Sequence, residues 1–171
     1  MKPEDIRRSV AAVIDHFRAH PHEAMSEDKP ARALLESGLR FRVEGPNSWV
    51  ITTDMTKALG GDASAPSPGW LRRAAQAACE ATMVAIRAAQ EGVQLDTLEV
   101  TIGSISDDRG MLGDSGGIHP GPTESRAHIK VSSKGTPEAK LREIVEWAEQ
   151  HSPVTDSLAR AVPHSLEIEI A

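Results

Sequence analysis

The sequence predicts a single domain of the α+β class with antiparallel strand pairing, on two observations. Apolar residues recur every three or four positions in segments 3–19 and 68–90, a spacing typical of amphipathic helices. Elsewhere apolar and polar residues alternate between turn sequences, a pattern typical of half-buried strands. The expected order is therefore helix, two strands, helix, two strands, two helices and a final strand.

The first segment, residues 3–19, predicts an amphipathic N-terminal helix. Prolines and polar residues dominate residues 20–38, which we interpret as a connector with at most one helical turn at Ala31–Ser37. This boundary separates the helix and connector, residues 1–38, from a main domain, residues 39–171. The apolar stripe of the helix lies opposite charged residues and consists of Ile6, Val10, Val13, Ile14 and Phe17.

A hairpin and the longest helix come next. Leu39, Phe41 and Val43 alternate with charged residues, a Pro-Asn turn follows, and residues 48–55 are rich in β-branched and aromatic side chains. After a loop of glycine, proline and serine, a helix is expected to start at Ser67 and Pro68. One face of this helix is rich in alanine, and such small side chains would let another backbone approach closely.

The C-terminal half predicts two strands, two helices and a last strand. Alternation occurs within residues 92–108 and 123–133, on either side of a glycine-rich loop. Thr136 as N-cap, followed by Pro137, predicts a helix that ends near His151. Ser152 and Pro153 start a short helix in the same way, and one face of the final strand carries Leu166, Ile168 and Ile170.

Composition excludes several classes of protein. The net charge is −6, and the chain has no Tyr, two Phe and three Trp, so it lacks the basic surface and stacking aromatics of nucleic-acid binding. We find no signal peptide and no window near the ~18 apolar residues of a membrane span, and we expect a soluble cytoplasmic protein. One cysteine permits no internal disulfide, and neither the histidines nor the glycines are spaced for a metal or nucleotide, so no cofactor is expected.

The single cysteine, Cys79, has two interpretations. As a nucleophile, its thiolate would attack the outer oxygen of a peroxide, and the helix start together with Arg72 and Arg73 would favour the negative charge. As a small apolar side chain, it would fill the alanine-rich face, where free cysteines are common. The residue pattern leaves both interpretations open.

Three segments of the chain resemble the OsmC/Ohr family, the osmotically inducible and organic-hydroperoxide-resistance proteins. They read PSPGWLRRAAQAAC from Pro66, LDTLEVTI from Leu95 and AEQHSPVTDSL from Ala148, and the resemblance extends over roughly residues 39–170. It implies an OsmC-like fold, with antiparallel sheets around a long central helix, in an intertwined homodimer that here has an extra N-terminal helix. It also implies that Cys79 occupies the position of the peroxide-reacting cysteine.

The chain departs from the family pattern at two positions. The second, resolving cysteine falls on Ser152, whose hydroxyl cannot form a disulfide. In the hydroperoxide-reducing branch a glutamate follows the loop proline, whereas here Gly69 follows it. An arginine from the first strand completes the site in that branch, and Arg40 and Arg42 are both candidates.

These features leave two main functions open. The first is a one-cysteine thiol-dependent peroxidase that acts on organic hydroperoxides in the oxidative stress response, with Cys79 as nucleophile, Arg40 or Arg42 as the stabilising cation and an external thiol as reductant. The second is a non-catalytic dimer that binds a small apolar ligand in an interfacial pocket lined by Trp70 and Met83. A third possibility, a protein partner, applies if the apolar stripe of the N-terminal helix is exposed.

Overall fold

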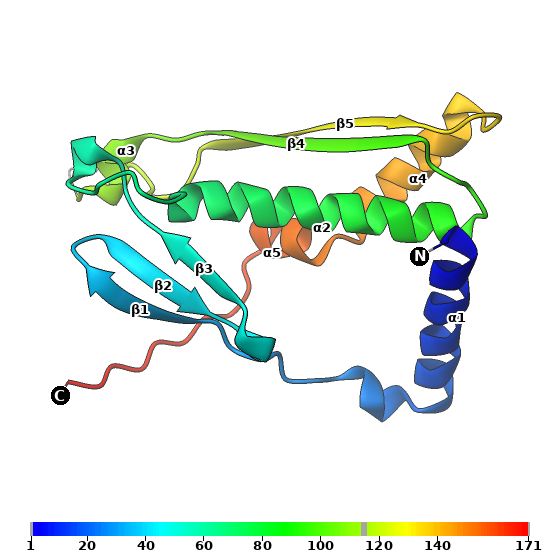
Figure 1. The fold of residues 1–171 in the computed structure, drawn as a ribbon, viewed down its shortest axis with the longest axis horizontal. Coiled ribbons are helices and arrows are strands. Elements are labelled where there is room, and N and C mark those ends of the chain that lie inside the picture. Colours follow the sequence, from blue (N-terminus) through cyan, green and yellow to red (C-terminus); the bar gives the residue numbers. More distant parts are fainter. Residues whose placement is uncertain (1, 114–115, 171) are drawn as a thin grey trace. The chain divides into compact units, whose positions relative to one another are not determined.

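A computed structural model describes residues 2–113 and 116–170 of the chain. Contacts within the chain divide it into two compact units. The first unit contains Gln76–Ile102, the residues before Arg8 and those from Ser125 onward, and the second contains Arg8–Ala75 and Gly103–Glu124. Helices and antiparallel strands are mixed along the chain (Figure 1), which confirms the predicted α+β class.

The described helices and strands follow the predicted order with few exceptions. In chain order they are α1 (Pro3–Ala19), β1 (Arg32–Ser37), β2 (Arg40–Glu44), β3 (Val50–Thr53), α2 (Pro68–Gln90), β4 (Thr97–Ile105), α3 (Asp108–Met111), β5 (Glu124–Ser132), α4 (Glu138–Gln150) and α5 (Pro153–Ala159). Both long helices predicted from apolar spacing, α1 and α2, are confirmed. No helix in the described ranges is both long and apolar enough to cross a membrane.

The second unit contains a three-stranded antiparallel sheet in the order β1-β2-β3. Phe41 in the central strand pairs with Leu35 of β1 and with Thr53 of β3, so the predicted hairpin of β2 and β3 is confirmed. The helical turn predicted at Ala31–Ser37 is wrong, because this segment forms β1. Its backbone groups pair with β2 instead of with one another, after a tight turn at Gly38 with a φ of 53°.

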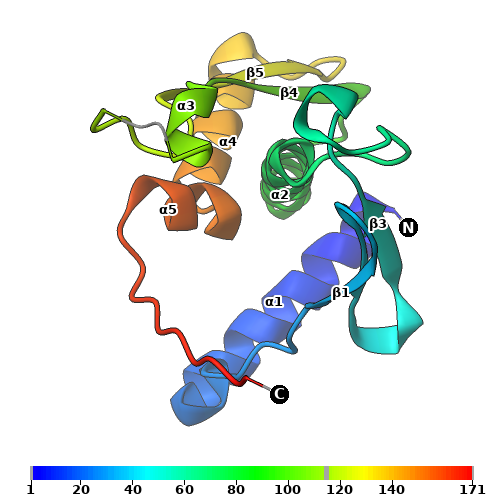
Figure 2. The same ribbon diagram turned by 90° about the vertical axis from the view of Figure 1, so that its left-hand side faces the viewer.

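The core of the first unit lies between α2 and α4. Val84 and Ala88 of α2 and Ile144 and Ala148 of α4 are fully or almost fully buried in one cluster. In this unit both helices lie on the same side of the paired strands β4 and β5 (Figure 2). The partly buried apolar side chains that pack against the cluster are Met83, Val93, Leu95, Leu98 and Val145.

Helix starts in the first unit follow the predicted caps in one case and not in the other. Ser152 caps α5, because its Oγ accepts a hydrogen bond of 3.4 Å from the backbone N–H of Thr155. The N-cap predicted at Thr136 is wrong: Pro137 is the cap residue, and Thr136 Oγ1 is hydrogen-bonded to Ser133 Oγ at 2.8 Å. The hydroxyl is thus engaged by the preceding turn and is not used by the helix.

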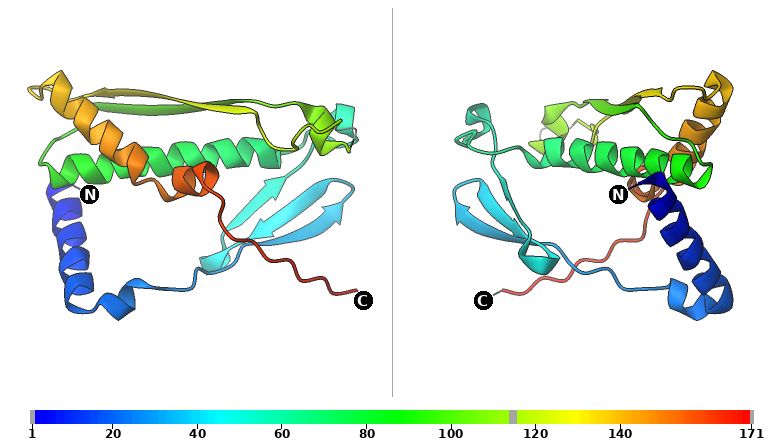
Figure 3. Two further views of the ribbon diagram at one scale, coloured as in Figure 1. Left: turned by 180° about the vertical axis from the view of Figure 1, so that it is seen from behind. Right: turned by 45° about the vertical axis from the view of Figure 1, so that its right-hand side comes forward.

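Apolar residues near both ends of the chain are exposed. The strand predicted at the C-terminus is wrong for the single chain, since residues 160–170 form no regular structure (Figure 3). Leu166, Ile168 and Ile170 are 77%, 71% and 87% exposed. The alternation is real, but a strand also needs a neighbour for its backbone groups. Helix α1 likewise buries no residue, and its apolar stripe is exposed at Val13, Ile14 and Phe17.

The glycine-rich segment predicted as a loop between β4 and β5 contains the short helix α3. Asp107 caps this helix, because its carboxylate accepts a hydrogen bond of 3.1 Å from the backbone N–H of Arg109. Residues 114 and 115 of the predicted loop lie outside the described residues. The predicted boundary between residues 38 and 39 stays a prediction.

Candidate functional site

Cys79 on α2 lies in direct contact with Ser152 at the start of α5. The Ser152 hydroxyl donates a hydrogen bond to Cys79 Sγ, with 3.2 Å between the two atoms. Ser152 is fully buried, whereas Cys79 is partly exposed. Two residues that are 73 positions apart in the sequence therefore form one polar contact.

The join between α4 and α5 fixes the position of the Ser152 hydroxyl. His151 stacks on Trp147 with 3.9 Å between the ring centroids and 11° between the planes, and its Nδ1 lies 2.7 Å from the Trp147 carbonyl oxygen. The Arg87 guanidinium of α2 lies over the same Trp147 ring, 4.8 Å from its centroid. These contacts, together with the cap to Thr155, hold Ser152 at the end of a rigid turn.

Glu80, the neighbour of Cys79 in sequence, is fully buried and was not identified from the sequence. Its Oε1 accepts hydrogen bonds from Thr155 Oγ1 at 2.8 Å and from Gln76 Nε2 at 3.0 Å. Its Oε2 is buried and has no hydrogen-bond partner within the described part of the chain. Burying a carboxylate in this way costs stability, so Glu80 is a strong candidate for a functional residue of this unit. Its signal in the sequence was a period of four along α2, at Gln76, Glu80, Val84 and Ala88.

The charge of Glu80 affects the pKa of a second acidic side chain in the same unit, Glu149. Loss of solvation raises the pKa of Glu149 on α4, and the charge of Glu80 raises this pKa further. Both effects favour the protonated form of Glu149, so Glu149 takes up a proton at a higher pH than an isolated glutamate does.

The N-terminal end of α2 lies too far from Cys79 for the helix dipole to stabilise a thiolate there. The helix begins at Pro68, so Cys79 lies about three turns from its first residue. The helix dipole acts only within about the first turn. The dipole of α2 therefore does not extend to Cys79, and the polar contact that the structure gives the sulfur comes from Ser152.

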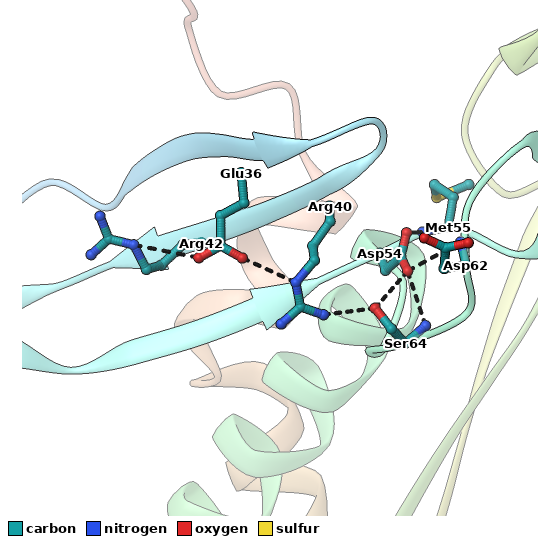
Figure 4. Close-up of polar contacts among 7 residues, drawn as sticks. All are labelled: Glu36, Arg40, Arg42, Asp54, Met55, Asp62 and Ser64. Carbon is teal, nitrogen blue, oxygen red and sulfur yellow. Dashed lines mark hydrogen bonds and ion pairs between the residues drawn. The ribbon is translucent and has the colours of Figure 1, made fainter.

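Both arginines predicted from the first strand of the hairpin lie on β2, in the second unit, and share one carboxylate (Figure 4). Arg40 Nε donates to Glu36 at 3.0 Å, and its Nη1 donates to Ser64 Oγ at 2.6 Å. Arg42 lies 3.7 Å from the other oxygen of Glu36 and also pairs with Glu44. The positive charge of Arg42 is therefore balanced by two carboxylates, while that of Arg40 is balanced by one that it shares.

Ser64 connects Arg40 to a buried carboxylate in the loop after β3 (Figure 4). Asp54 accepts hydrogen bonds from the backbone N–H of Ser64 at 2.9 Å and from the Ser64 hydroxyl at 2.7 Å. It also accepts from the backbone N–H groups of Met55 at 2.7 Å and Asp62 at 3.2 Å. These bonds, with those from Ser64 the strongest, hold the pKa of Asp54 below its ordinary value. Asp54 thereby fixes the loop that positions the hydroxyl partner of Arg40.

The two residues predicted to line an apolar ligand pocket belong to different units. Met83 packs against the buried cluster of the first unit. Trp70 belongs to the second unit and is 49% exposed. A pocket lined by both residues stays a prediction. The described residues contain no group of three or more His, Cys, Asp or Glu side chains placed to hold a metal ion.

Comparison with known proteins identifies the family of this arrangement. The family model described as OsmC-like protein matches residues 61–167, which include both Cys79 and Ser152. Similar solved structures include an OsmC-like protein from Mycoplasma pneumoniae, with a TM-score of 0.67 and 17% identity over 79% of this chain and 89% of that chain. An OsmC-like protein of unknown function from Vibrio cholerae has a TM-score of 0.60 and 12% identity over 78% of this chain and 94% of that chain.

A third similar structure carries a functional name. It is an organic hydroperoxide resistance protein, OsmC, from Legionella pneumophila, with a TM-score of 0.57 and 18% identity over 78% of this chain and 90% of that chain. No curated protein matches the chain. At these identities the structural likeness concerns the fold, which agrees with the predicted OsmC-like architecture.

Proposed function

The chain belongs to the OsmC family, and we propose that it is a one-cysteine thiol peroxidase that reduces organic hydroperoxides in the oxidative stress response. The observation that carries the proposal is the contact of 3.2 Å between Ser152 Oγ and Cys79 Sγ. It keeps a buried hydrogen-bond donor beside the sulfur of a partly exposed cysteine, and a nucleophile that reacts with a peroxide requires such access.

In the first step the sulfur of Cys79 attacks the outer oxygen of the hydroperoxide. An S–O bond forms, the O–O bond breaks, and its electron pair leaves on the inner oxygen, which takes up a proton to become an alcohol. The sulfur is oxidised to sulfenic acid and the peroxide is reduced. The Ser152 hydroxyl, which donates to the sulfur, stabilises negative charge at the reacting atoms.

Recovery of the thiol requires an external reductant, because Ser152 cannot supply a second sulfur. A small thiol condenses with the sulfenic acid, which forms a mixed disulfide and releases water. A second thiol then attacks the mixed disulfide, releasing a disulfide and reduced Cys79. Each hydroperoxide reduced therefore consumes two thiols.

Of the two arginines, we propose Arg40 and not Arg42 as the cation that stabilises negative charge on the peroxide. The charge of Arg42 is held by Glu36 and Glu44, whereas Arg40 shares Glu36 and donates its other bond to the neutral hydroxyl of Ser64. A cation with less compensation attracts a developing alkoxide more strongly. Arg40→Gln should therefore slow the reaction with hydroperoxide more than Arg42→Gln does.

A homodimer is part of the proposal. The alternating segment that ends the described chain leaves Leu166, Ile168 and Ile170 exposed, and an extended segment of this kind is suited to pair with the edge of a sheet. The exposed apolar stripe of α1 would also be stabilised by burial against another surface. A second copy of the chain would provide both. Because the only thiol must stay reduced to act, we also assign the protein to the cytoplasm.

Turnover tests the proposal directly. Purified protein with dithiothreitol should consume cumene hydroperoxide, and Cys79→Ser should abolish this activity while leaving the circular dichroism spectrum unchanged. Ser152→Ala should slow the reaction, since the sulfur loses its hydrogen-bond donor. Absence of turnover above the Cys79→Ser control would reject the enzyme and favour the non-catalytic dimer that binds a small apolar ligand.

A further inference from the structure

The second unit contains a cavity whose lining does not include Cys79 or Ser152. Its volume is about 520 Å³, which lies in the usual range for small-molecule sites. The loop after β3, the first turns of α2 and the segment around α3 contribute its walls. Much of the lining is apolar and comes from Met55, Leu59, Pro68, Met111, Pro120 and Pro122.

Two arginines from the first turns of α2 line the same cavity. Arg73 Nη1 donates to Ser104 Oγ at 3.4 Å. Arg72 forms no hydrogen bond or ion pair with any residue that the structure describes, and its Nη2 atom is shielded from water. The Nη2 atom carries two of the five N–H donors of the guanidinium, and keeping these two from water without an acceptor costs free energy. The cavity therefore lacks an acceptor for Arg72.

The charges in the lining favour an anion. Besides the two arginines, one carboxylate, that of Asp108, lines the cavity, and within the described part of the chain neither arginine forms an ion pair with it. The formal charge of the lining is therefore +1. The N-terminal end of α2, at Pro68 and Gly69, adds a partial positive charge to the same cavity.

We propose that this cavity binds a small amphipathic anion, with one carboxylate held by Arg72 and Arg73 and an apolar body of one or two rings among the methionines and prolines. Carboxylates accept two parallel hydrogen bonds from a guanidinium, which supplies the missing acceptor for Arg72. A single negative charge matches the net charge of the lining, and the apolar walls disfavour a multiply charged phosphate ester. This site goes beyond the proposed peroxidase and does not depend on Cys79.

Binding of 2-naphthoate to the full chain tests the proposal, with 2-naphthamide as a neutral probe of the same shape. Titration calorimetry should show one saturable site per chain and an affinity at least about tenfold higher for the carboxylate, since a charge-assisted hydrogen bond contributes that much. Arg72→Gln should remove this preference, and Asp108→Asn should strengthen naphthoate binding. Arg160→Gln, which removes the same charge at an exposed position outside the cavity, should leave both affinities unchanged.

Three results would overturn the proposal. One is equal affinity for the two probes, and another is naphthoate binding that survives both Arg72→Gln and Arg73→Gln. The third is loss of naphthoate binding in Cys79→Ser, which would move the ligand to the peroxidase site. If Arg72→Gln does not fold, Asp108→Asn still decides, because an unchanged naphthoate affinity in that variant contradicts a site governed by the charge of this lining.

Discussion

Replacing Ser152 by cysteine should restore a disulfide partner for Cys79. The hydroxyl oxygen lies 3.2 Å from Sγ, so a thiol on the same Cβ needs to approach by only about 1 Å to reach disulfide bonding distance. Treatment of the Ser152→Cys variant with a hydroperoxide should first produce sulfenic acid at Cys79. The introduced thiol should then attack it, forming the disulfide and releasing water.

The size of the effect follows from the chain that the disulfide would close. The two positions are 73 residues apart, and a loop of that length corresponds to about 4 kcal/mol of stabilisation in the chain-entropy model. Loss of the Ser152 cap on α5 would offset this by about 1 kcal/mol. The oxidised variant should therefore be about 4 kcal/mol more stable than its reduced form and about 3 kcal/mol more stable than the wild type, and the second difference corresponds to a rise in Tm of roughly 6–12 °C for a chain of this size.

Intact mass spectrometry and urea unfolding provide the assay. After one equivalent of cumene hydroperoxide, the Ser152→Cys variant should lose the mass of two hydrogen atoms, and its unfolding midpoint should fall when dithiothreitol is added. Ser157→Cys is the matched control, because this residue lies on the exposed side of α5 and bonds to the Val154 carbonyl. It should gain oxygen at Cys79 and form no disulfide. Equal behaviour of the two variants would refute the contact between Cys79 and Ser152.

Three further predictions concern the buried acids and one glycine. Glu80→Ala should lower the free energy of unfolding by about 1–3 kcal/mol, because the Thr155 hydroxyl loses its acceptor, and Glu80→Gln should cost less; equal urea midpoints for the two variants would contradict this. Asp54 has a lowered pKa in the folded chain, so its contribution to stability is present above the ordinary carboxyl pKa and is lost as pH falls through the folded value. Asp54→Asn should therefore flatten the dependence of the urea midpoint on pH in the acid range. An unchanged slope would contradict this. Gly61→Ala should lower Tm, since a Cβ would collide with the backbone oxygen of Met55. A Tm equal to that of the wild type in a thermal melt would contradict this, because it would mean that the loop accommodates the Cβ without loss of stability.

Helices were predictable to the residue where local rules decide them. Prolines mark the starts of α1 and α2, and apolar spacing covers their full lengths of Pro3–Ala19 and Pro68–Gln90. Strands depend on partners elsewhere in the chain. Arg32–Ser37 lacks clean alternation and becomes β1 only because β2 pairs with it. The alternating C-terminal segment has the pattern but finds no neighbouring strand among the described residues.

The candidate site was partly predictable from the sequence for similar reasons. Ser152 carries both a local signal, its cap on α5, and the position of the second cysteine implied by the family resemblance. The cap alone does not place Ser152 beside Cys79, whereas the family resemblance implies this contact, because a resolving cysteine must reach the peroxide-reacting one. Glu80 and Asp54 were missed because acidic residues are rarely buried, and their hydrogen-bond partners lie on other segments of the chain. Only the period of four along α2 marks Glu80 as facing inward.

Trapping of the oxidised sulfur shows whether Cys79 reacts with a hydroperoxide. Wild-type protein, reduced and freed of thiols, is mixed with one equivalent of cumene hydroperoxide in the presence of dimedone, and the modified residue is located by peptide mass spectrometry. We expect a dimedone adduct to form rapidly on Cys79, to form more slowly in Ser152→Ala and to be absent in Cys79→Ser. An unmodified Cys79 after prolonged exposure to the hydroperoxide would contradict this.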